Sequence, residues 1–186
     1  MPTVNSVDRR YTGLPARVAS STIMAIEVRE ATPDEWDEAG RVTADAYREF
    51  VRDADWKSYL DQIANVRGRA DRTTIIVAVD DRRIVGSATL ELEGRVEPED
   101  DPTLEPDEAH IRMLGVAPDQ RGTGIGSLLM DVCEARARAA GKTFVTLHTT
   151  SRMSAAQAMY ASRGYRRGTD RVFDDGFVLL SYSKRL

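Results

Sequence analysis

The chain has 186 residues, of which 41% are hydrophobic and 30% are charged, with a net charge of −4 and one cysteine. This length allows a self-sufficient core, and the composition is that of a soluble globular protein without the roughly 18 consecutive apolar residues of a membrane span. A single cysteine excludes an internal disulfide framework and a cysteine-based zinc cluster, so we expect a cytoplasmic protein that binds no metal.

The charge is unevenly distributed along the chain. Residues 1–118 carry 15 basic and 24 acidic side chains, whereas residues 119–186 carry 11 basic and 6 acidic ones. Because summed fields steer charged ligands, this asymmetry would suit an anionic cofactor beside the C-terminal part and a cationic substrate beside the N-terminal part. Scattered, solvated charges are the simpler explanation, and we expect neither nucleic acid nor a membrane as a partner.

The first residues differ in character from those that follow. Residues 1–23 contain three arginines with serine and threonine but no apolar stretch, so they do not resemble a secretory signal. We expect them to form a loose tail. Apolar and charged residues then alternate over residues 26–30, which predicts a strand. A single folded domain is therefore expected over residues 24–186.

Two helices are predicted before the main sheet. Thr32, followed by a proline and two acids, is typical of a helix start, and apolar residues at helical spacing continue to about residue 50. Further apolar residues at steps of three and four, from Trp56 to Val66, predict a second amphipathic helix that ends near Gly68.

Strands are predicted in the middle of the chain. Residues 73–79 and 84–90 are rich in β-branched and apolar side chains and flank four polar residues, which predicts a β-hairpin. The stretch 97–108 (EPEDDPTLEPDE) holds seven acids and three prolines, so we expect an exposed loop. Strand character resumes over residues 110–116.

The last third of the chain alternates between helix and strand. Residues 126–140 predict a helix, with Gly141 where a C-terminal cap belongs. A strand at 144–148, a short helix at 154–163 and a hairpin at 171–183 follow. The predicted order is β-α-α-β-β-β-α-β-α-β-β, and the predicted fold class is α/β (α+β), a mixed sheet with helices on its faces.

The strongest functional signal is a run of three alternate glycines, Gly122, Gly124 and Gly126, directly before a predicted helix. Glycine lets backbone N–H groups approach an anion, and a helix N-terminus adds unpaired donors, so the turn is predicted to bind a phosphate or pyrophosphate. A Walker loop requires a lysine that is absent, and a dinucleotide fingerprint requires glycine where Ser127 stands. A turn that merely connects strand and helix is the alternative.

The segment from Arg121 to Gly126 (RGTGIG) matches the Arg/Gln-x-x-Gly-x-Gly/Ala signature of the GNAT superfamily of N-acetyltransferases. The preceding residues 114–118 (LGVAP) resemble a strand of that family, and residues 156–165 (AQAMYASRGY) are similar to its Ala-x-x-x-Tyr-x-x-x-Gly-Phe/Tyr helix. The resemblance covers most of residues 26–186. It implies a GNAT-like acyl-CoA N-acyltransferase fold and acetyl-CoA as the acyl donor.

The resemblance also implies where acetyl-CoA would bind. Backbone groups of Leu114, Gly115 and Val116 would pair with the pantetheine arm. The pyrophosphate would be wrapped by the residues that follow: Arg121, Gly122, Thr123, Gly124, Ile125, Gly126 and Ser127.

The pattern of the strand before the glycines is irregular. Ile111, Leu114 and Val116 cannot all face one side of a strand with strict alternation, so an extra residue is predicted near Met113. Such a β-bulge leaves backbone groups free for a ligand, and a main-chain N–H at this point could hold an acyl carbonyl.

Acyl transfer to an amine requires a base for the ammonium proton and an acid for the leaving thiolate. Tyr160 matches the tyrosine that acts as the acid in many members of the family, with a packing role as the alternative. His110 is the favoured base, since it precedes the cofactor segment on the same strand and has an intrinsic pKa of about 6.5. A structural role for His110, with Glu108 or a water chain as the base, stays open, and His148 is a weaker candidate.

Two further positions bear on the site. Cys133 lies four residues after Leu129 on the apolar stripe of a predicted helix, so we expect a buried packing thiol rather than a nucleophile. Met153 departs from the family pattern, in which a polar Asn often precedes the Ala and Tyr, and Ser154 could substitute for that Asn.

The predicted activity is direct transfer of an acetyl group from acetyl-CoA to a primary amine of a small molecule or peptide. The acidic stretch at 97–108 motivates the hypothesis of a cationic acceptor, which we expect between the first two helices and the hairpin at 171–183. The alternatives are a non-catalytic acyl-CoA sensor or regulatory module and an O-acyltransferase. The resemblance also allows a homodimer.

Overall fold

The computed structural model describes residues 25–50, 57–93, 104–174 and 176–186. The predicted tail at 1–23, the first residue of the predicted second helix, Trp56, and most of the acidic stretch 97–108 lie outside these ranges. Within them, no helix is both long and apolar enough to cross a membrane.

Within the described ranges, eight strands form one mixed sheet in the order β1-β2-β3-β4-β5-β8-β6, and β7 pairs with β8. Neighbouring strands run antiparallel except for β4 and β5, which are parallel. The mixed sheet predicted from the sequence is thereby confirmed. The strands are β1 (Glu27–Glu30), β2 (Thr74–Asp80), β3 (Arg83–Glu91), β4 (Glu108–Val116), β5 (Phe144–Thr149), β6 (Arg166–Arg167), β7 (Arg171–Val172) and β8 (Val178–Arg185).

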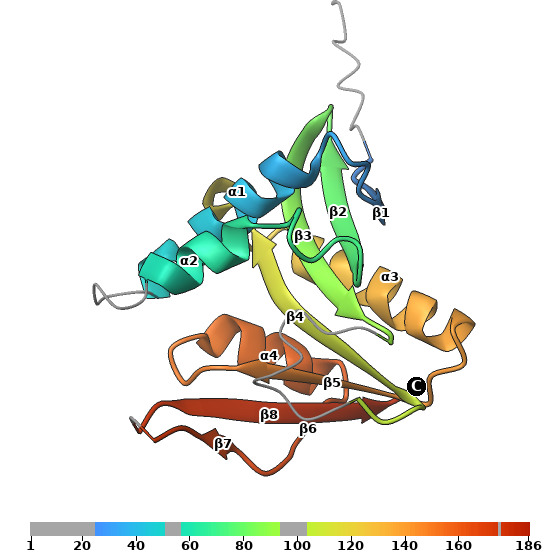
Figure 1. Cartoon of the computed structure of the whole chain (residues 1–186), viewed down its shortest axis with the longest axis vertical. Helices are drawn as coiled ribbons and strands as arrows, with labels where there is room; N and C mark the ends of the chain where they lie inside the picture. The colour runs from blue at the N-terminus through green and yellow to red at the C-terminus, as the bar shows by residue number, and fades with distance from the viewer. Residues whose placement is uncertain (1–24, 51–56, 94–103, 175) are drawn as a thin grey trace, which may run out of the picture.

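Helices cover both faces of this sheet (Figure 1), with α1 and α2 on one face and α3 and α4 on the other. The helices are α1 (Trp36–Tyr47), α2 (Lys57–Ala64), α3 (Ile125–Ala139) and α4 (Ser154–Ser162), with short 3₁₀ turns η1 (Arg48–Phe50) after α1 and η3 (Pro118–Gln120) after β4. Glycines let both layers approach closely. A Cβ on Gly115 would lie 3.0 Å from the Cβ of Ala46 in α1, and one on Gly86 would lie 3.1 Å from Ile125 and Leu129 in α3.

The second helix ends earlier than its sequence pattern predicts, at Ala64 rather than near Gly68. The side chain of Arg69 folds back and donates hydrogen bonds to carbonyl oxygens of Gln62, Ile63 and Asn65 at 2.9 to 3.1 Å. These are carbonyls that a helix leaves without a partner at its C-terminus. Because the guanidinium satisfies them, the chain can leave the helix and turn toward β2.

Three other features of the strands differ modestly from the prediction. Strand β4 begins at Glu108, inside the stretch predicted as a loop, and β6 was not predicted. The predicted hairpin at 171–183 is uneven, because β7 has only two residues opposite the eight of β8.

The main core lies between the sheet and the helices α3 and α4. Its fully buried members come from the sheet and from α3 and include Ile76, Leu90, Ile111, Leu129, Met130, Cys133 and Leu147. Burying a side chain of this size contributes about 1.5–3 kcal/mol each to stability. Cys133 is confirmed as a buried packing thiol, and burial raises its pKa from 9.0 to about 12. A thiol so far from ionisation is a poor nucleophile.

Candidate functional site

A β-bulge interrupts β4 at the predicted place. Ser87 of β3 pairs with Gly115 of β4, and Thr89 pairs with Arg112, so two residue steps on β3 correspond to three on β4. Met113, inside this interval, has a left-handed backbone with φ of 53°, which is uncommon for a residue other than glycine. An extra residue of this kind disrupts the ladder and re-aims the backbone.

Strands β4 and β5 separate immediately before this bulge. Their parallel pairing joins Glu108–Ile111 to Phe144–Leu147, and among the described residues β4 pairs with β5 no further than Ile111, while its pairing with β3 continues to Val116. Figure 1 shows β4 turning away from β5 toward α1. From the bulge to Val116, this edge of β4 therefore has no strand beside it among the described residues, and we call this separation of the backbones of β4 and β5 the opening.

The glycine-rich turn follows β4 and leads into α3. Gly122 and Gly124 have φ of 76° and 91°, and a Cβ built on either would meet nothing within 4 Å. The second of them is the N-terminal cap of α3, whose first N–H groups have no partner within the helix. Positive φ and open space at the start of a helix are the features that allow backbone donors to surround a phosphate.

Gly126 differs from the two glycines before it. A Cβ at this position would lie 3.3 Å from the sulfur of Met159 in α4. This glycine therefore serves close packing between α3 and α4, and only its N–H could contribute to anion binding.

Arg121 points away from the turn that it introduces. Its guanidinium donates to the carbonyl oxygen of Ala46 at 2.9 Å, forms an ion pair with Glu49, and lies 5.9 Å from the centre of the Phe50 ring. Its side chain thus ties the turn to the end of α1. In this arrangement the turn offers backbone donors, not this guanidinium, to an anion.

The candidate acid, Tyr160, projects from α4 into the core beside the opening. Its side chain is 6% exposed, and the rings of Tyr165 and Tyr182 lie 5.9 Å away. Burial is the main reason that the pKa of Tyr160 lies well above its usual value of 10.0. Its phenol therefore stays protonated at neutral pH, as a proton donor requires.

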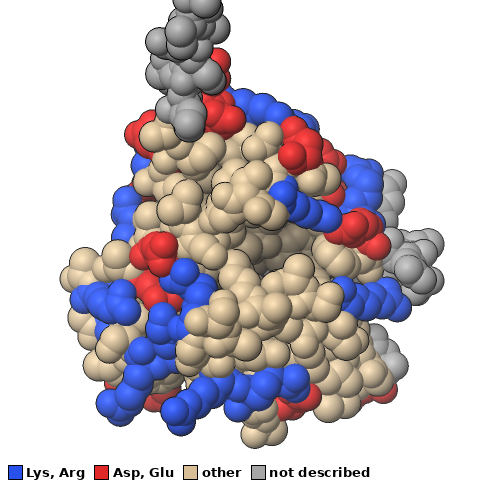
Figure 2. Space-filling model, turned by 180° about the vertical axis from the view of Figure 1, so that it is seen from behind, with Lys and Arg blue, Asp and Glu red and all other residues tan. Residues whose placement is uncertain are grey.

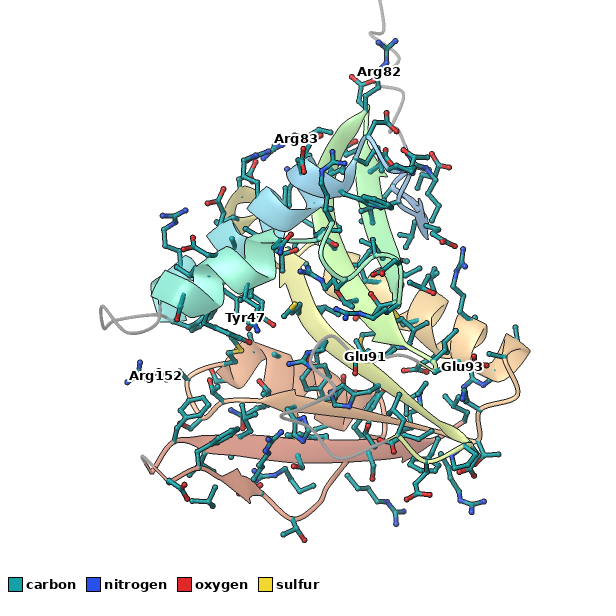
Figure 3. All side chains as sticks on the ribbon, in the orientation of Figure 1. Tyr47, Arg82, Arg83, Glu91, Glu93 and Arg152 are labelled. Carbon is teal, nitrogen blue, oxygen red and sulfur yellow. The ribbon has the colours of Figure 1, made fainter. Side chains whose placement is uncertain are left out.

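A second, partly buried phenol comes from the other side of the sheet. Tyr47 is the last residue of α1, and burial, followed by the nearby phenols of Tyr59 and Tyr160, raises its pKa well above 10.0. Figure 3 shows Tyr47 between the end of α1 and α4. The opening between β4 and β5 thus has a tyrosine at each face.

The candidate base, His110, lies on the opposite face from Tyr160. It pairs across the strands with Glu91, whose neighbour Leu90 points into the core beside α3. The histidine is 3% exposed, its Nδ1 lies 2.7 Å from the hydroxyl of Thr146, and the His148 ring is 5.0 Å away. Glu108 accepts a hydrogen bond from the same hydroxyl at 2.5 Å. The structure thus brings together His110, Glu108 and His148.

Other functional candidates were missed in the sequence. Glu91 is fully buried, and its carboxylate lies 3.5 Å from the guanidinium of Arg112 on the next strand (Figure 3). Its position could have indicated this, because Glu91 directly follows the apolar run of β3 and therefore continues a buried strand. The hydroxyl of Thr150, just after β5, is buried and has no hydrogen-bond partner within the described ranges.

At the position that departs from the family pattern, the one side-chain hydrogen bond found among the described residues is accepted by the thioether of Met153 from the hydroxyl of Thr149. Met153 precedes α4 without a side-chain cap, and its sulfur lies 3.5 Å from the hydroxyl of Thr149. Ser154 is exposed at the first turn of α4.

Seen from the side opposite to Figure 1, the surface is hollowed near its centre, and uncharged residues line the hollow (Figure 2). Lys and Arg side chains gather toward the lower edge of this view. The acidic stretch that motivates a cationic acceptor belongs mostly to residues outside the described ranges.

Comparison with known proteins agrees with this geometry. The sequence profile of the acetyltransferase (GNAT) family matches residues 31–165. No significant match was found among curated proteins.

Solved structures share the fold at low sequence identity. A GNAT-family acetyltransferase from Staphylococcus aureus is 18% identical, with a TM-score of 0.65 over 87% of this chain and 99% of its own. The ribosomal-protein-S18-alanine N-acetyltransferase of Escherichia coli is 16% identical, with a TM-score of 0.63 over 87% and 94%. The yncA protein of Salmonella typhimurium, solved with its cofactor acetyl-CoA, is 16% identical, with a TM-score of 0.62 over the same shares.

Proposed function

The chain belongs to the acetyltransferase (GNAT) family, and from this premise we propose that it transfers an acetyl group from acetyl-CoA to a primary amine by direct transfer. One observation carries the proposal. The bulge at Met113, the separation of β4 from β5 and the two left-handed glycines before α3 follow one another within fifteen residues of chain, 110–124. Together they offer unpaired backbone along an opening that ends at a helix N-terminus.

Acetyl-CoA fits the residues that surround this opening. The backbone of Leu114, Gly115 and Val116 would pair with the pantetheine arm, and N–H groups of residues 121–127 would hold the pyrophosphate. The buried hydroxyl of Thr150 would find in the pantetheine arm the hydrogen-bond partner that the described residues do not provide. When bound, acetyl-CoA supplies an activated thioester whose carbonyl carbon can accept an amine.

The residues of the chain would then move two protons. His110 would take a proton from the ammonium group, so that the nitrogen lone pair forms the new C–N bond as the C–S bond breaks. Tyr160, whose phenol remains protonated, would give its proton to the departing sulfur. The products are an amide and free CoA. The nitrogen loses its second proton after the C–N bond forms, and exchange with solvent returns His110 and Tyr160 to their starting protonation states.

The acceptor is proposed only by class. A primary amine on a small molecule or peptide fits the chemistry, and the acidic stretch at 97–108 supports a cationic one. A cytoplasmic location agrees with the single cysteine, and a homodimer is retained as the proposed assembly.

The proposal is tested by release of free CoA thiol from acetyl-CoA across a panel of neutral and cationic amines, with the wild type and Tyr160→Phe. We expect turnover that depends on the amine and that falls at least tenfold in Tyr160→Phe without a change in acetyl-CoA affinity. Tight acetyl-CoA binding without turnover on any amine would instead support the non-catalytic sensor. Equal turnover in Tyr160→Phe would remove Tyr160 as the acid.

A further inference from the structure

We propose that Thr146 and Glu108 are positioning residues that hold His110 in the tautomer in which Nε2 is the basic nitrogen. This inference rests on the proposed function, in which His110 accepts the ammonium proton. It gives Glu108, a candidate base from the sequence, a different role. Thr146 had no sequence signal at all.

The register of the parallel strands places these three side chains together. His110 of β4 pairs with Thr146 of β5. Glu108 precedes His110 by two residues on β4 and pairs with Phe144. Side chains two residues apart on a strand share a face. The hydroxyl of Thr146 therefore lies between the imidazole and the carboxylate, 2.7 Å from Nδ1 and bonded to Glu108 at 2.5 Å.

The direction of each hydrogen bond follows from the donor and acceptor inventory. Glu108 accepts from the Thr146 hydroxyl through one oxygen and from the backbone N–H of Glu105 through the other, at 3.1 Å. Thr146 has one hydroxyl hydrogen, which goes to the carboxylate, so its oxygen must accept from His110. The imidazole donor is therefore Nδ1–H, and Nε2 carries the lone pair of the neutral ring.

The chain of bonds also affects the charged form of the ring. When Nε2 takes a proton, the imidazolium keeps its Nδ1–H bond to Thr146, and the polarised hydroxyl links the positive charge to the Glu108 carboxylate. On the described strands around it, the other charged or titratable groups that face His110 are Glu91 on β3, Arg112 on β4 and His148 on β5. The variants compared for turnover below leave all three unchanged, and only the sample used to assign the spectrum replaces His148.

The chain offers a matched control for the threonine. Thr143, also beside β4, donates from its hydroxyl to the carboxylate of Asp107 at 2.5 Å, but this pair is exposed. A substitution of Thr143 removes the same kind of bond without touching His110.

The test combines turnover with a direct measurement of the tautomer. The ¹⁵N spectrum of the imidazole reports which nitrogen carries the proton, and with only two histidines a His148→Asn sample assigns the signals. We expect the Nδ1–H form in the wild type and in Thr146→Ser, and a gain of the Nε2–H form in Thr146→Val. In Thr146→Val kcat should fall about tenfold or more, with the KM for acetyl-CoA within about twofold of wild type. Thr146→Ser should recover most of the loss, and Thr143→Val should behave as wild type.

Glu108→Gln removes the charge while its amide oxygen can still accept from Thr146, although the amide NH₂ can no longer accept from the backbone N–H of Glu105. Loss of the carboxylate removes the negative charge that faces the imidazolium through Thr146, so turnover should fall while the Nδ1–H form of His110 remains. Wild-type turnover in Thr146→Val, or a loss of turnover with an unchanged tautomer in that variant, would overturn the proposal. A wild type that acetylates no amine would contradict the proposed function alone. The ¹⁵N spectrum would still test whether Thr146 and Glu108 hold His110 in the Nδ1–H form, because that measurement needs no turnover.

Discussion

The guanidinium of Arg121 donates a hydrogen bond of 2.9 Å to the main-chain oxygen of Ala46, which joins the glycine-rich turn to the last turn of α1. Helix carbonyls at this end lack partners within the helix, and a nearby cation is favourable there. The side chain of Arg121 therefore fixes where the turn lies, while its backbone and that of the following residues are left for an anion.

Arg121→Met should consequently affect stability more than acetyl-CoA binding. We expect the free energy of unfolding to fall by about 1 kcal/mol, the contribution of one hydrogen bond of this kind. The KM for acetyl-CoA should rise only slightly. Urea unfolding and steady-state kinetics measure the two effects, and a large rise in KM at unchanged stability would mean that the guanidinium binds the cofactor directly.

Gly124→Val should show the opposite behaviour. A branched side chain on this left-handed residue would project into the open space that we assign to the pyrophosphate, so acetyl-CoA affinity should fall at least tenfold. Gly141→Val is a matched control, since Gly141 also has positive φ, 78°, and open space but lies at the far end of α3. Calorimetric titration of both folded variants with acetyl-CoA compares them. Equal acetyl-CoA affinities of the two variants would mean that the pyrophosphate does not bind at Gly124.

The buried thiol of Cys133 should make the protein less stable in alkaline solution. Its pKa is about 12 in the folded state and 9.0 as a reference, so the unfolded chain loses this proton first. Stability from this group is complete below about pH 9 and declines as pH rises, by up to about 1.4 kcal/mol per pH unit. Between pH 8.5 and 9.5 the free energy of unfolding should fall more steeply in the wild type than in Cys133→Ala, whatever their absolute stabilities. Parallel slopes would contradict this assignment.

Glu35 should contribute stability that is lost in acid. Its carboxylate accepts two hydrogen bonds of 2.7 Å from Arg29, and the pKa falls from 4.5 to about 2, mainly because of Arg29. A depressed pKa stabilises the fold above about pH 4.5, and the contribution disappears as pH falls toward 2.

Glu35→Gln should therefore cost about 1–2 kcal/mol at pH 7 and much less at pH 2.5, as measured by urea unfolding at both values. Asp37→Asn provides the comparison, since Asp37 forms a similar pair with Arg67 at an exposed position. It should leave stability close to that of the wild type. An equal loss at both pH values in Glu35→Gln would assign its effect to packing.

Local patterns were sufficient to predict the elements that position the site. The spacing of Ile111, Leu114 and Val116 was enough to place the bulge. In a strand with strict alternation these three apolar side chains cannot all face the same side, so one extra residue must lie between them. Glycines before and after α3 marked its two ends because a left-handed backbone favours glycine in any context. The hairpin of β2 and β3 followed from two apolar runs around a short polar turn.

Contacts between distant segments could not be predicted in the same way. Thr146 is one of several threonines in a strand, and its role depends on lying beside His110 after β4 and β5 pair. Arg121 carries a recognisable motif position, yet its side chain is directed by partners more than seventy residues earlier. Such roles arise from tertiary packing, which a single sequence does not encode in any local period.

Hydrogen exchange with and without acetyl-CoA tests the central claim most directly, because it reports on individual backbone N–H groups. We predict slower exchange in residues 114–116 and 122–127 on addition of acetyl-CoA, with little change in residues 108–111, which already pair with β5. Turnover with acetyl-CoA but without protection in either of the first two segments would contradict the assignment of the opening between β4 and β5 as the acetyl-CoA site.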